Sequence, residues 1–377
     1  MPHEPIRIAI VGTGNIARIH MAALTKVAAP AAGAPVKAEV VAAADIDEGR
    51  LAAFAREHKI SATFHDAGEL LSEVRPDLLH ICTPPRLHHE QALACLRAGV
   101  TALVEKPPAI SLRELEELAA AEAPAGTPGG PWLATVFQHR FGPGQRTLKE
   151  LAASGTLGRP LLAVCHTTWF RDQAYFDVPW RGRWDTEGGG PTMGHGIHQM
   201  DMLLDVLGDW TTVSAAARTL ARRTQTEDVS LAHVTFGSGA VASVVNSVIS
   251  PREESLLRYD FENATVELTH LYGYGEGNWR VTPAPGHADA VLAGWQGEPP
   301  GGRSVSRSGH HAQFREILTA LRAGTRPPVE TADSRRTLSL VAAIYASAFQ
   351  GGCPVTPGDL APGTPFYEAM NGGRAAW

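Results

Sequence analysis

Residues 8–17 of the chain read IAIVGTGNIA. A short apolar run is followed by a turn with two glycines, and a helical pattern begins after the turn. Gly12 permits a tight turn, Gly14 lets the backbone approach a pyrophosphate, and the small Ala17 lets the helix pack close to the strand. The N-terminus of that helix offers N–H donors and a partial positive charge to an anion. A glycine turn without any ligand is the alternative. The strand–turn–helix setting favours a dinucleotide site formed by Gly12, Thr13, Gly14, Asn15 and Ile16.

Strand and helix patterns alternate outward from this motif as far as residue 137. Further strands are expected at 40–44, 62–64, 78–82, 102–104 and 133–137, with helices between them. Such alternation implies right-handed crossovers. It therefore predicts a doubly wound parallel sheet, which is a Rossmann domain over residues 1–137.

The pattern changes after residue 137. Strands at 161–169, 212–216, 231–236, 241–248 and 256–269 follow one another, and helices are expected at 198–207, 313–323 and 334–349. Strands in succession favour antiparallel pairing. The predicted fold class is α/β, with a second domain over residues 138–377 for substrate binding and oligomerisation. That α+β domain is expected to contain a large, mostly antiparallel, open-faced sheet.

Composition and charge argue against several classes of protein. The chain has 377 residues, 44% of them hydrophobic and 19% charged, which suits two domains with hydrophobic cores and not disorder. A net charge of −6 without a run of five like charges argues against nucleic-acid binding. No apolar stretch approaches the ~20 residues of a membrane span, and no signal peptide is recognised. The four cysteines lack C-x-x-C spacing and indicate a reduced, cytoplasmic protein.

Asp45 follows the second expected strand. A carboxylate at this place accepts hydrogen bonds from the adenosine ribose and repels a 2′-phosphate, so NAD is expected as the cofactor rather than NADP. An ordinary solvated carboxylate in a turn is the alternative.

Two later loops carry polar residues at the carboxyl ends of strands, where a doubly wound sheet binds its ligand. The run TPPRLH at 83–88 follows the fourth strand and EKP at 105–107 follows the fifth, so Lys106 is expected to face the nicotinamide. A lysine ammonium beside an alcohol stabilises the developing oxyanion, and where burial and nearby cofactor charge lower its pKa, the neutral amine helps to accept the proton. Only five of the 33 Lys and Arg residues are lysines, which weakens the alternative of an incidental surface lysine.

The run GGGPTMGHGIHQMD at 188–201 leads into an expected helix. His198 starts that helix and Asp201 lies one turn later on the same face, so the carboxylate can orient the imidazole for proton transfer. A purely structural histidine is the alternative. His195 and His198 also have the spacing of a metal pair, but no acidic or cysteine ligand completes the set, and no metal is expected.

Tryptophan, tyrosine and arginine crowd the segment before this motif. Aromatic rings pack on the C–H faces of sugars, and guanidinium groups bind hydroxyls or carboxylates. Substrate binding and the anchoring of a long loop both remain open for these side chains. The candidate substrate residues are Lys106, Arg171, Tyr175, Trp180, Arg183, His195 and His198.

Taken together, these motifs resemble the Gfo/Idh/MocA oxidoreductases over nearly the whole chain. The shared runs are GTGNIA at 12–17, EKP at 105–107, FQHRF at 137–141, SGTLGRP at 154–160 and the GGG…GxHxxD element at 188–201. The resemblance implies NAD(P)-dependent oxidation or reduction of sugars and cyclitols by a homo-oligomer, a dimer or tetramer assembled through the C-terminal sheet. It makes Lys106 and His198 catalytic. The further cofactor residues it implies are Thr83, Pro84, His88, Glu105, Lys106 and Gln138.

One position departs from the family pattern. Many members carry an aspartate four residues before the histidine, whereas this chain has Gly194. His195, or the carboxylate of Asp185 or Glu187, is expected to take over part of that role.

The expected function is an NAD-dependent dehydrogenase of a sugar, polyol or cyclitol, with His198 as general base and Lys106 polarising the same oxygen. Two alternatives on the same scaffold stay open. One is a glycosidase that uses transient oxidation by bound NAD, and the other is a non-catalytic regulator that senses NAD and sugar.

Overall fold

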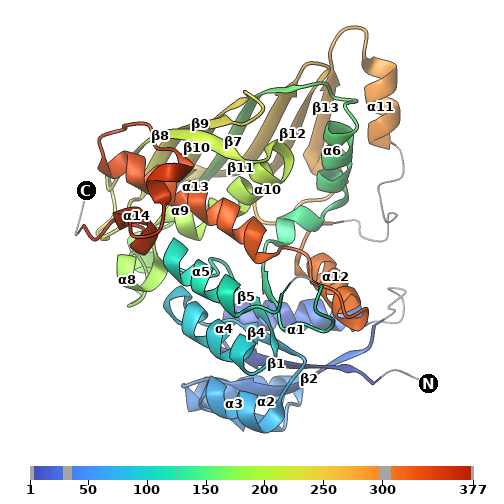
Figure 1. The fold of residues 1–377 in the computed structure, drawn as a ribbon, viewed down its shortest axis with the longest axis vertical. Coiled ribbons are helices and arrows are strands. Elements are labelled where there is room, and N and C mark those ends of the chain that lie inside the picture. The colour runs from blue at the N-terminus through green and yellow to red at the C-terminus, as the bar shows by residue number, and fades with distance from the viewer. Residues whose placement is uncertain (1–3, 29–35, 125, 297–306, 375–377) are drawn as a thin grey trace. The chain divides into compact units, whose positions relative to one another are not determined.

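The computed structural model describes residues 4–28, 36–124, 126–296 and 307–374. The chain forms two compact units, each built around its own β-sheet (Figure 1). Unit 1 comprises Met1–Ala109, Glu114–Val136 and His310–Ser334. Unit 2 comprises Ile110–Arg113, Phe137–Gly309 and Arg335–Trp377.

The sheet of unit 1 has six strands in the order β3-β2-β1-β4-β5-β6, and every neighbouring pair is parallel. The predicted Rossmann sheet is thereby confirmed. Its strands are β1 (Ile6–Val11), β2 (Ala38–Ala44), β3 (Ala62–Phe64), β4 (Leu78–Ile81), β5 (Thr101–Val104) and β6 (Leu133–Thr135). The helices that connect them are α1 (Asn15–Ala28), α2 (Glu48–His58), α3 (Ala67–Val74), η2 (Pro85–Leu87), α4 (His88–Arg97) and α5 (Leu112–Ala121).

Local sequence signals explain these elements. All four residues of β4 and of β5 are buried, as expected for parallel strands covered on both faces. The carboxylate of Asp66 caps α3, accepting hydrogen bonds from the amides of Gly68 at 2.8 Å and Glu69 at 3.0 Å.

A late helix, α12 (His310–Arg322), belongs to unit 1. Its side chains Phe314, Ile317 and Leu318 are almost fully buried in one cluster with apolar residues of β1 and α1. A division of the chain at residue 137 places residues 310–334 in the second domain instead. Residues 310–334 belong to unit 1 because α12 packs on the apolar face of α1 and buries it.

The sheet of unit 2 has seven strands in the order β13-β12-β11-β7-β10-β9-β8. The pair β7–β10 is parallel and the other neighbours are antiparallel, so the predicted mostly antiparallel sheet is confirmed. The strands are β7 (Pro160–Phe170), β8 (Trp210–Arg218), β9 (Val229–Phe236), β10 (Val241–Ser247), β11 (Ile249–Phe261), β12 (Ala264–His270) and β13 (Trp279–Pro283).

Two expectations for this unit were wrong in detail. The single strand expected at 256–269 is in fact parts of β11 and β12, which pair with each other across a turn at 262–263. Strand β13 and helix α11 (Ala288–Gln296) were not predicted, because they lie in a segment rich in glycine and proline where periodicity is weak.

Helices cover one face of this sheet. Helix α10 (Ile197–Leu207) contacts β7 and β11, and α9 (Pro191–Gly194) contacts β9 and β10. Leu162 of β7 and Leu231 of β9 remain 43% and 53% exposed, which shows the open face expected from the sequence. Helix α13 (Thr331–Phe349) begins in unit 1 and continues in this unit from Arg335. The other helices of this unit are η3 (Gln138–Phe141), α6 (Pro143–Ala153), α7 (Gln173–Phe176), α8 (Trp184–Glu187), η4 (Glu276–Asn278), η5 (Pro357–Leu360) and α14 (Pro365–Glu368).

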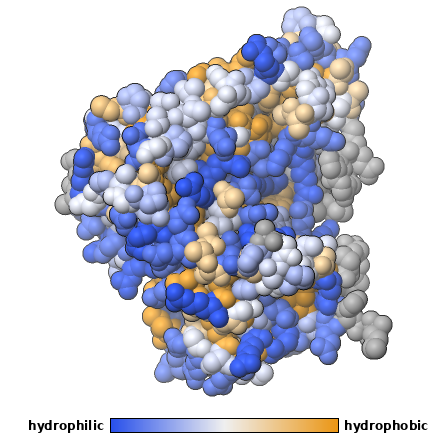
Figure 2. Space-filling model, viewed as in Figure 1, coloured by the Kyte–Doolittle hydropathy of each residue, from blue (hydrophilic) through white to orange (hydrophobic). Residues whose placement is uncertain are grey.

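Hydrophilic residues predominate on the molecular face drawn in Figure 2. Within the described ranges, no helix combines the length and the apolar character needed to cross a bilayer.

Candidate active site

The turn between β1 and α1 has the shape of a phosphate-binding loop. Gly12 has a φ of +82°, and a Cβ there would lie 2.8 Å from the carbonyl of Cys82, so only glycine fits. Apart from Gly14 itself and its chain neighbours, no heavy atom of the described residues lies within 4 Å of the Cβ position at Gly14, which leaves the backbone open to a ligand. Helix α1 starts at Asn15 and has no acidic residue in its first turn. The turn therefore fits the pyrophosphate of a dinucleotide.

The order of the strands places other predicted residues at the same edge of the sheet. The chain winds outward from β1 to β2 and β3 on one side, and from β4 to β5 and β6 on the other. Ligands of doubly wound sheets bind at such a reversal of strand order. Gly12, Thr83 and Lys106 follow the neighbouring strands β1, β4 and β5, so they share this edge.

Asp45 follows β2 and is bonded to the turn. Its Oδ2 accepts hydrogen bonds from the amide and the hydroxyl of Thr13 at 2.7 and 2.9 Å. Arg50 donates to both oxygens from Nε and Nη2, at 3.1 and 3.0 Å. Burial by itself raises the pKa of Asp45, but hydrogen bonds from Arg50, Asp47 and Thr13 outweigh burial and lower it, so the carboxylate is ionised. Arg50, whose side chain is 45% exposed, was not singled out from the sequence.

His88 ties the loops after β4 and β5 together. Its Nδ1 lies 2.7 Å from the carbonyl oxygen of Pro107, and its Nε2 lies 2.8 Å from that of Thr83. Both ring nitrogens thus lie against backbone carbonyls, so His88 links the two loops, and its contact with the cofactor stays a prediction. Lys106 is half-buried in one of these loops, and Pro84 is half-buried in the other.

A buried cluster behind Lys106 was missed by sequence reasoning. His20 Nε2 lies 2.9 Å from Glu105 Oε1, and His310 Nε2 lies 3.6 Å from the same oxygen. His20 Nδ1 lies 2.9 Å from His80 Nδ1. Burial opposes ionisation of Glu105, but the two histidines that bond to it outweigh burial and hold its pKa well below the usual value. Three of these side chains, His20, Glu105 and His310, are close enough to hold a metal ion, although their mutual bonds also satisfy them without one.

The glycine run Gly188–Gly190 is a packing element of unit 2. A Cβ at Gly189 would overlap the hydroxyl of Tyr345, and one at Gly190 would overlap the backbone carbonyl of Glu227. The Glu227 carboxylate accepts a hydrogen bond from the Gly190 amide at 3.1 Å, and burial raises its pKa to about 7. The run thus sets the path of the chain into α9 and α10.

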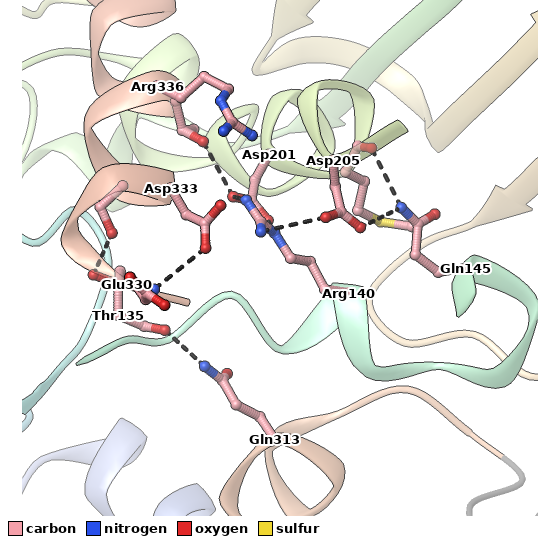
Figure 3. A network of polar contacts seen from close by, with 12 residues as sticks. Thr135, Arg140, Gln145, Asp201, Asp205, Gln313, Glu330, Asp333 and Arg336 are labelled. Carbon is pink, nitrogen blue, oxygen red and sulfur yellow. Dashed lines mark hydrogen bonds and ion pairs between the residues drawn. The ribbon is translucent and has the colours of Figure 1, made fainter. Parts of the chain in front are cut away.

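His198 opens α10 as predicted and is 8% exposed. Its ring packs on that of His139, with the centroids 4.8 Å apart. One turn later, both oxygens of Asp201 accept hydrogen bonds from Arg140, from Nε and Nη2 at 2.6 Å each. Figure 3 shows the guanidinium of Arg140 between Asp201 and Asp205, which are both on α10. This ion pair was not foreseen, and the role of Asp201 in orienting His198 stays a prediction.

Several predicted substrate residues gather in unit 2. The guanidinium of Arg171 lies 5.8 Å from the ring centre of Tyr175, and the Tyr175 hydroxyl lies 3.5 Å from Nε2 of His195. Between the rings of Tyr175 and Trp180 the structure places Arg181, at 3.9 and 4.2 Å from their centres. These side chains form a compact aromatic and cationic group. It includes Arg181, which is not among the substrate residues predicted from the sequence.

The remaining predicted residues are distributed differently. Arg183 is exposed and pairs with Asp185 at 3.3 Å. Gln138 belongs to unit 2, and its amide oxygen is buried without a hydrogen-bond partner among the described residues. Lys106 belongs to unit 1 and His198 to unit 2.

Comparison with known proteins gives the class of this chain. The family described as "Oxidoreductase family, NAD-binding Rossmann fold" matches residues 6–128, and the "GFO/IDH/MocA C-terminal domain" matches residues 145–269. Together the two matches cover well over half of the sequence. The chain therefore belongs to the Gfo/Idh/MocA family and is an oxidoreductase with an NAD-binding Rossmann fold.

Two relatives that cover most of the chain are named as carbohydrate dehydrogenases. D-glucoside 3-dehydrogenase of Escherichia coli (strain K12) is 28% identical over 296 residues, which cover 72% of this chain and 80% of that protein. D-apiose dehydrogenase of Paraburkholderia graminis is 28% identical over 358 residues, which cover 91% and 88%. The crystal structure of the WlbA dehydrogenase from Bordetella pertussis, in complex with NADH and UDP-GlcNAcA, has a TM-score of 0.79 at 25% identity. That match covers 94% of this chain and 99% of the other.

Proposed function

We propose that this protein is an NAD-dependent dehydrogenase that moves a hydride between nicotinamide and a hydroxyl-bearing carbon of a sugar, polyol or cyclitol. The observation that carries the proposal is the position of Lys106, two residues after the end of β5 and at the same sheet edge as the phosphate-binding turn. The relatives named for glucosides and apiose support a carbohydrate substrate. When bound, the nicotinamide supplies the group that accepts or donates the hydride.

In this proposal two side chains act on one hydroxyl. Lys106 binds the oxygen and stabilises the charge that develops on it, and His198 takes the proton as general base. The ring of His139 packed on His198 restricts the rotation of the imidazole. Arg171, Tyr175, Trp180, Arg183 and His195 are the proposed contacts to the rest of the carbohydrate, with rings on its C–H faces and polar groups on its hydroxyls.

The cofactor preference is proposed to depend on Asp45. Exchanging Asp45 for serine should move the ratio of NADP to NAD dissociation constants about tenfold to a hundredfold in favour of NADP. The negative charge that repels a 2′-phosphate is lost. Arg50 also loses both of its hydrogen bonds to Asp45 and keeps the longer 3.7 Å pairing with Asp47, so its guanidinium can turn to that phosphate. The two constants are measured by isothermal titration calorimetry.

The matched control for this experiment is the Asp45→Ser, Arg50→Ala double variant. It should gain much less affinity for NADP, because the released guanidinium is absent. An unchanged ratio in Asp45→Ser would show that Asp45 does not select the cofactor.

We also propose that the protein works in the cytoplasm as a homo-oligomer, a dimer or tetramer formed through the open face of the unit 2 sheet. The exposed side chains of Leu162 and Leu231 on that face support self-association, since apolar surface gains from burial. The four cysteines are all free thiols, in keeping with a reducing compartment.

A substrate panel tests the proposed reaction. Sugars, polyols, cyclitols and anhydrosugars are incubated with NAD and with NADP, nicotinamide absorbance is followed, and products are identified. Formation of NADH together with a ketone product supports the proposal. Release of a sugar from a glycoside without a net change in absorbance would support the glycosidase alternative. Binding of NAD and sugar with neither outcome would support a regulator.

A further inference from the structure

We propose that Glu187 supplies the carboxylate that this chain lacks at residue 194. It acts as a positioning residue that holds Tyr175 and His195 for the substrate through Arg181. The inference rests on the proposed dehydrogenase function and assigns that site a residue whose place sequence reasoning had left open.

The space beside Gly194 gives the first argument. Apart from its chain neighbours and the backbone of its own helix, the one heavy atom of the described residues within 4 Å of a Cβ built on Gly194 is Oε1 of Glu187, at 3.6 Å. An aspartate at 194 would therefore direct its carboxylate into the volume that the Glu187 carboxylate already occupies. Gly194 ends α9, and its φ is not in the left-handed region, so the backbone there accepts a side chain without strain.

A continuous series of polar contacts runs from Glu187 to His195. Glu187 is 5% exposed, and its Oε1 accepts a hydrogen bond from Nη1 of Arg181 at 3.1 Å. Arg181 Nη1 also donates to the hydroxyl of Tyr175, and the guanidinium lies 3.9 Å from the centre of that ring. The Tyr175 hydroxyl in turn lies 3.5 Å from Nε2 of His195. The carboxylate thus reaches a predicted substrate residue through two intermediates.

The charge of Glu187 explains why these groups hold together. Arg181 is largely buried, with 25% of its side chain exposed, and Glu187 provides a counter-ion inside the protein. Burial, followed by the Glu187 charge, raises the pKa of Tyr175, so its hydroxyl stays protonated and can donate to an acceptor. Removal of the carboxylate charge frees the guanidinium to turn toward water and releases Tyr175.

The other carboxylate that sequence reasoning left open does not fit this position. The side chain of Asp185 is 64% exposed and pairs with Arg183, which is itself exposed. Glu187, two residues later, follows the turn of α8 into the protein interior.

Glu187 also has a bond that is purely structural. Its Oε2 accepts a hydrogen bond from the Gly182 amide at 2.7 Å, which fixes the loop before α8. A simple loss of activity on substitution would not separate the two roles. Glu187→Gln separates them, because the amide oxygen of glutamine can still accept the Gly182 bond while the charge is lost, and an aspartate at 194 then restores the charge near Arg181.

The experiment uses Glu187→Gln, Gly194→Asp and the double variant, with Glu150→Gln on the exposed side of α6 as the control. Four quantities are measured on the full chain: kcat/KM for the best sugar of the panel, KM for NAD, the pH profile of kcat/KM, and the melting temperature without ligands. Glu187→Gln should lower kcat/KM for the sugar about tenfold to a hundredfold, the usual effect of losing one charged hydrogen bond. KM for NAD should stay unchanged in every variant, as should all parameters of Glu150→Gln.

The relocation is the decisive comparison. Gly194→Asp alone places two carboxylates in one volume, which raises the pKa of one of them. Its melting temperature should fall, and the acid limb of its pH profile should move to higher pH. In the double variant the introduced aspartate should cost less stability than in Gly194→Asp, because a carboxylate and an amide do not repel each other, and it should recover most of the activity lost in Glu187→Gln.

Each contrary result has a definite meaning. A double variant no more active than Glu187→Gln, with the melting temperature of the wild type, would overturn the inference and leave Glu187 as a loop anchor. Full activity of Glu187→Gln in a protein that turns over sugars would also overturn it, while the proposed function stands. If the wild type turns over no sugar with either cofactor, the proposed function itself fails, and the inference fails with it.

Discussion

Replacement of Lys106 by alanine is expected to lower kcat about 100-fold to 10,000-fold, the range attributed to a positioned acid–base group. The side chain follows β5 at the edge of the sheet that also carries the phosphate-binding turn, where a substrate hydroxyl would meet the cofactor. The affinity for NAD should change little, because the loop itself is held by other bonds, such as that between His88 and the Pro107 carbonyl. Stopped-flow turnover and a titration with NAD measure the two effects.

Three further variants sharpen this test. Lys106→Arg keeps the positive charge but presents it on a larger, planar group that cannot place a donor at the same point, so it should recover part of the substrate affinity and little of kcat. His198→Asn should lower kcat to a similar degree and remove the acid limb of the pH profile, which reports the general base. Lys26→Ala, at an exposed position of α1, is the control and should match the wild type. Wild-type turnover in Lys106→Ala would contradict the catalytic assignment.

Asp201→Asn is expected to destabilise the protein by about 3–5 kcal/mol, because it removes the closer of the two carboxylates that balance the buried charge of Arg140. The Arg140 and Asp201 side chains are 9% and 1% exposed, and two bonds of 2.6 Å join them. Chemical denaturation followed by circular dichroism gives the free energy of unfolding. The loss of stability should lower the denaturant concentration at the midpoint of unfolding and leave the dependence of the unfolding free energy on denaturant concentration unchanged.

An exposed ion pair of the same unit provides the comparison for Asp201. Asp209 is 83% exposed and bonds to Arg336 at 2.9 Å, so Asp209→Asn should cost no more than about 1 kcal/mol. Equal losses in the two variants would mean that burial of the Arg140 pair adds nothing to its effect.

The Rossmann sheet could be predicted because its signals are local. Gly12 and Gly14 mark the first turn, and Asp66 with Glu69 marks the start of a helix. Each signal acts within a few residues, where sequence reasoning is strongest. The division of the chain was harder to predict. The packing of Phe314 against α1 joins residues almost 300 positions apart, and no local pattern reports such a contact.

The site shows the same contrast. Lys106 and His198 could be proposed from motifs, because each is the chemically distinctive member of a short run. The parts played by Arg50, Arg140 and Glu187 could not, since each depends on which side chain lies opposite in space. The sequence alone does not distinguish Glu187 from Asp185, and it is the burial of Glu187, its bond to Arg181 and its distance from the Cβ position of residue 194 that do so.

The return of α12 to unit 1 has a consequence for biosynthesis. Chains grow from the N-terminus, and α12 is synthesised long after α1. Helix α12 covers the apolar side of α1 and carries His310, which pairs with Glu105. The nucleotide-binding half therefore cannot reach its final packing while the ribosome is still making the strands of the other sheet. Until residue 322 has left the ribosome, the nascent chain exposes the apolar side chains of α1 that α12 later covers. Such exposed apolar surface is what chaperones bind.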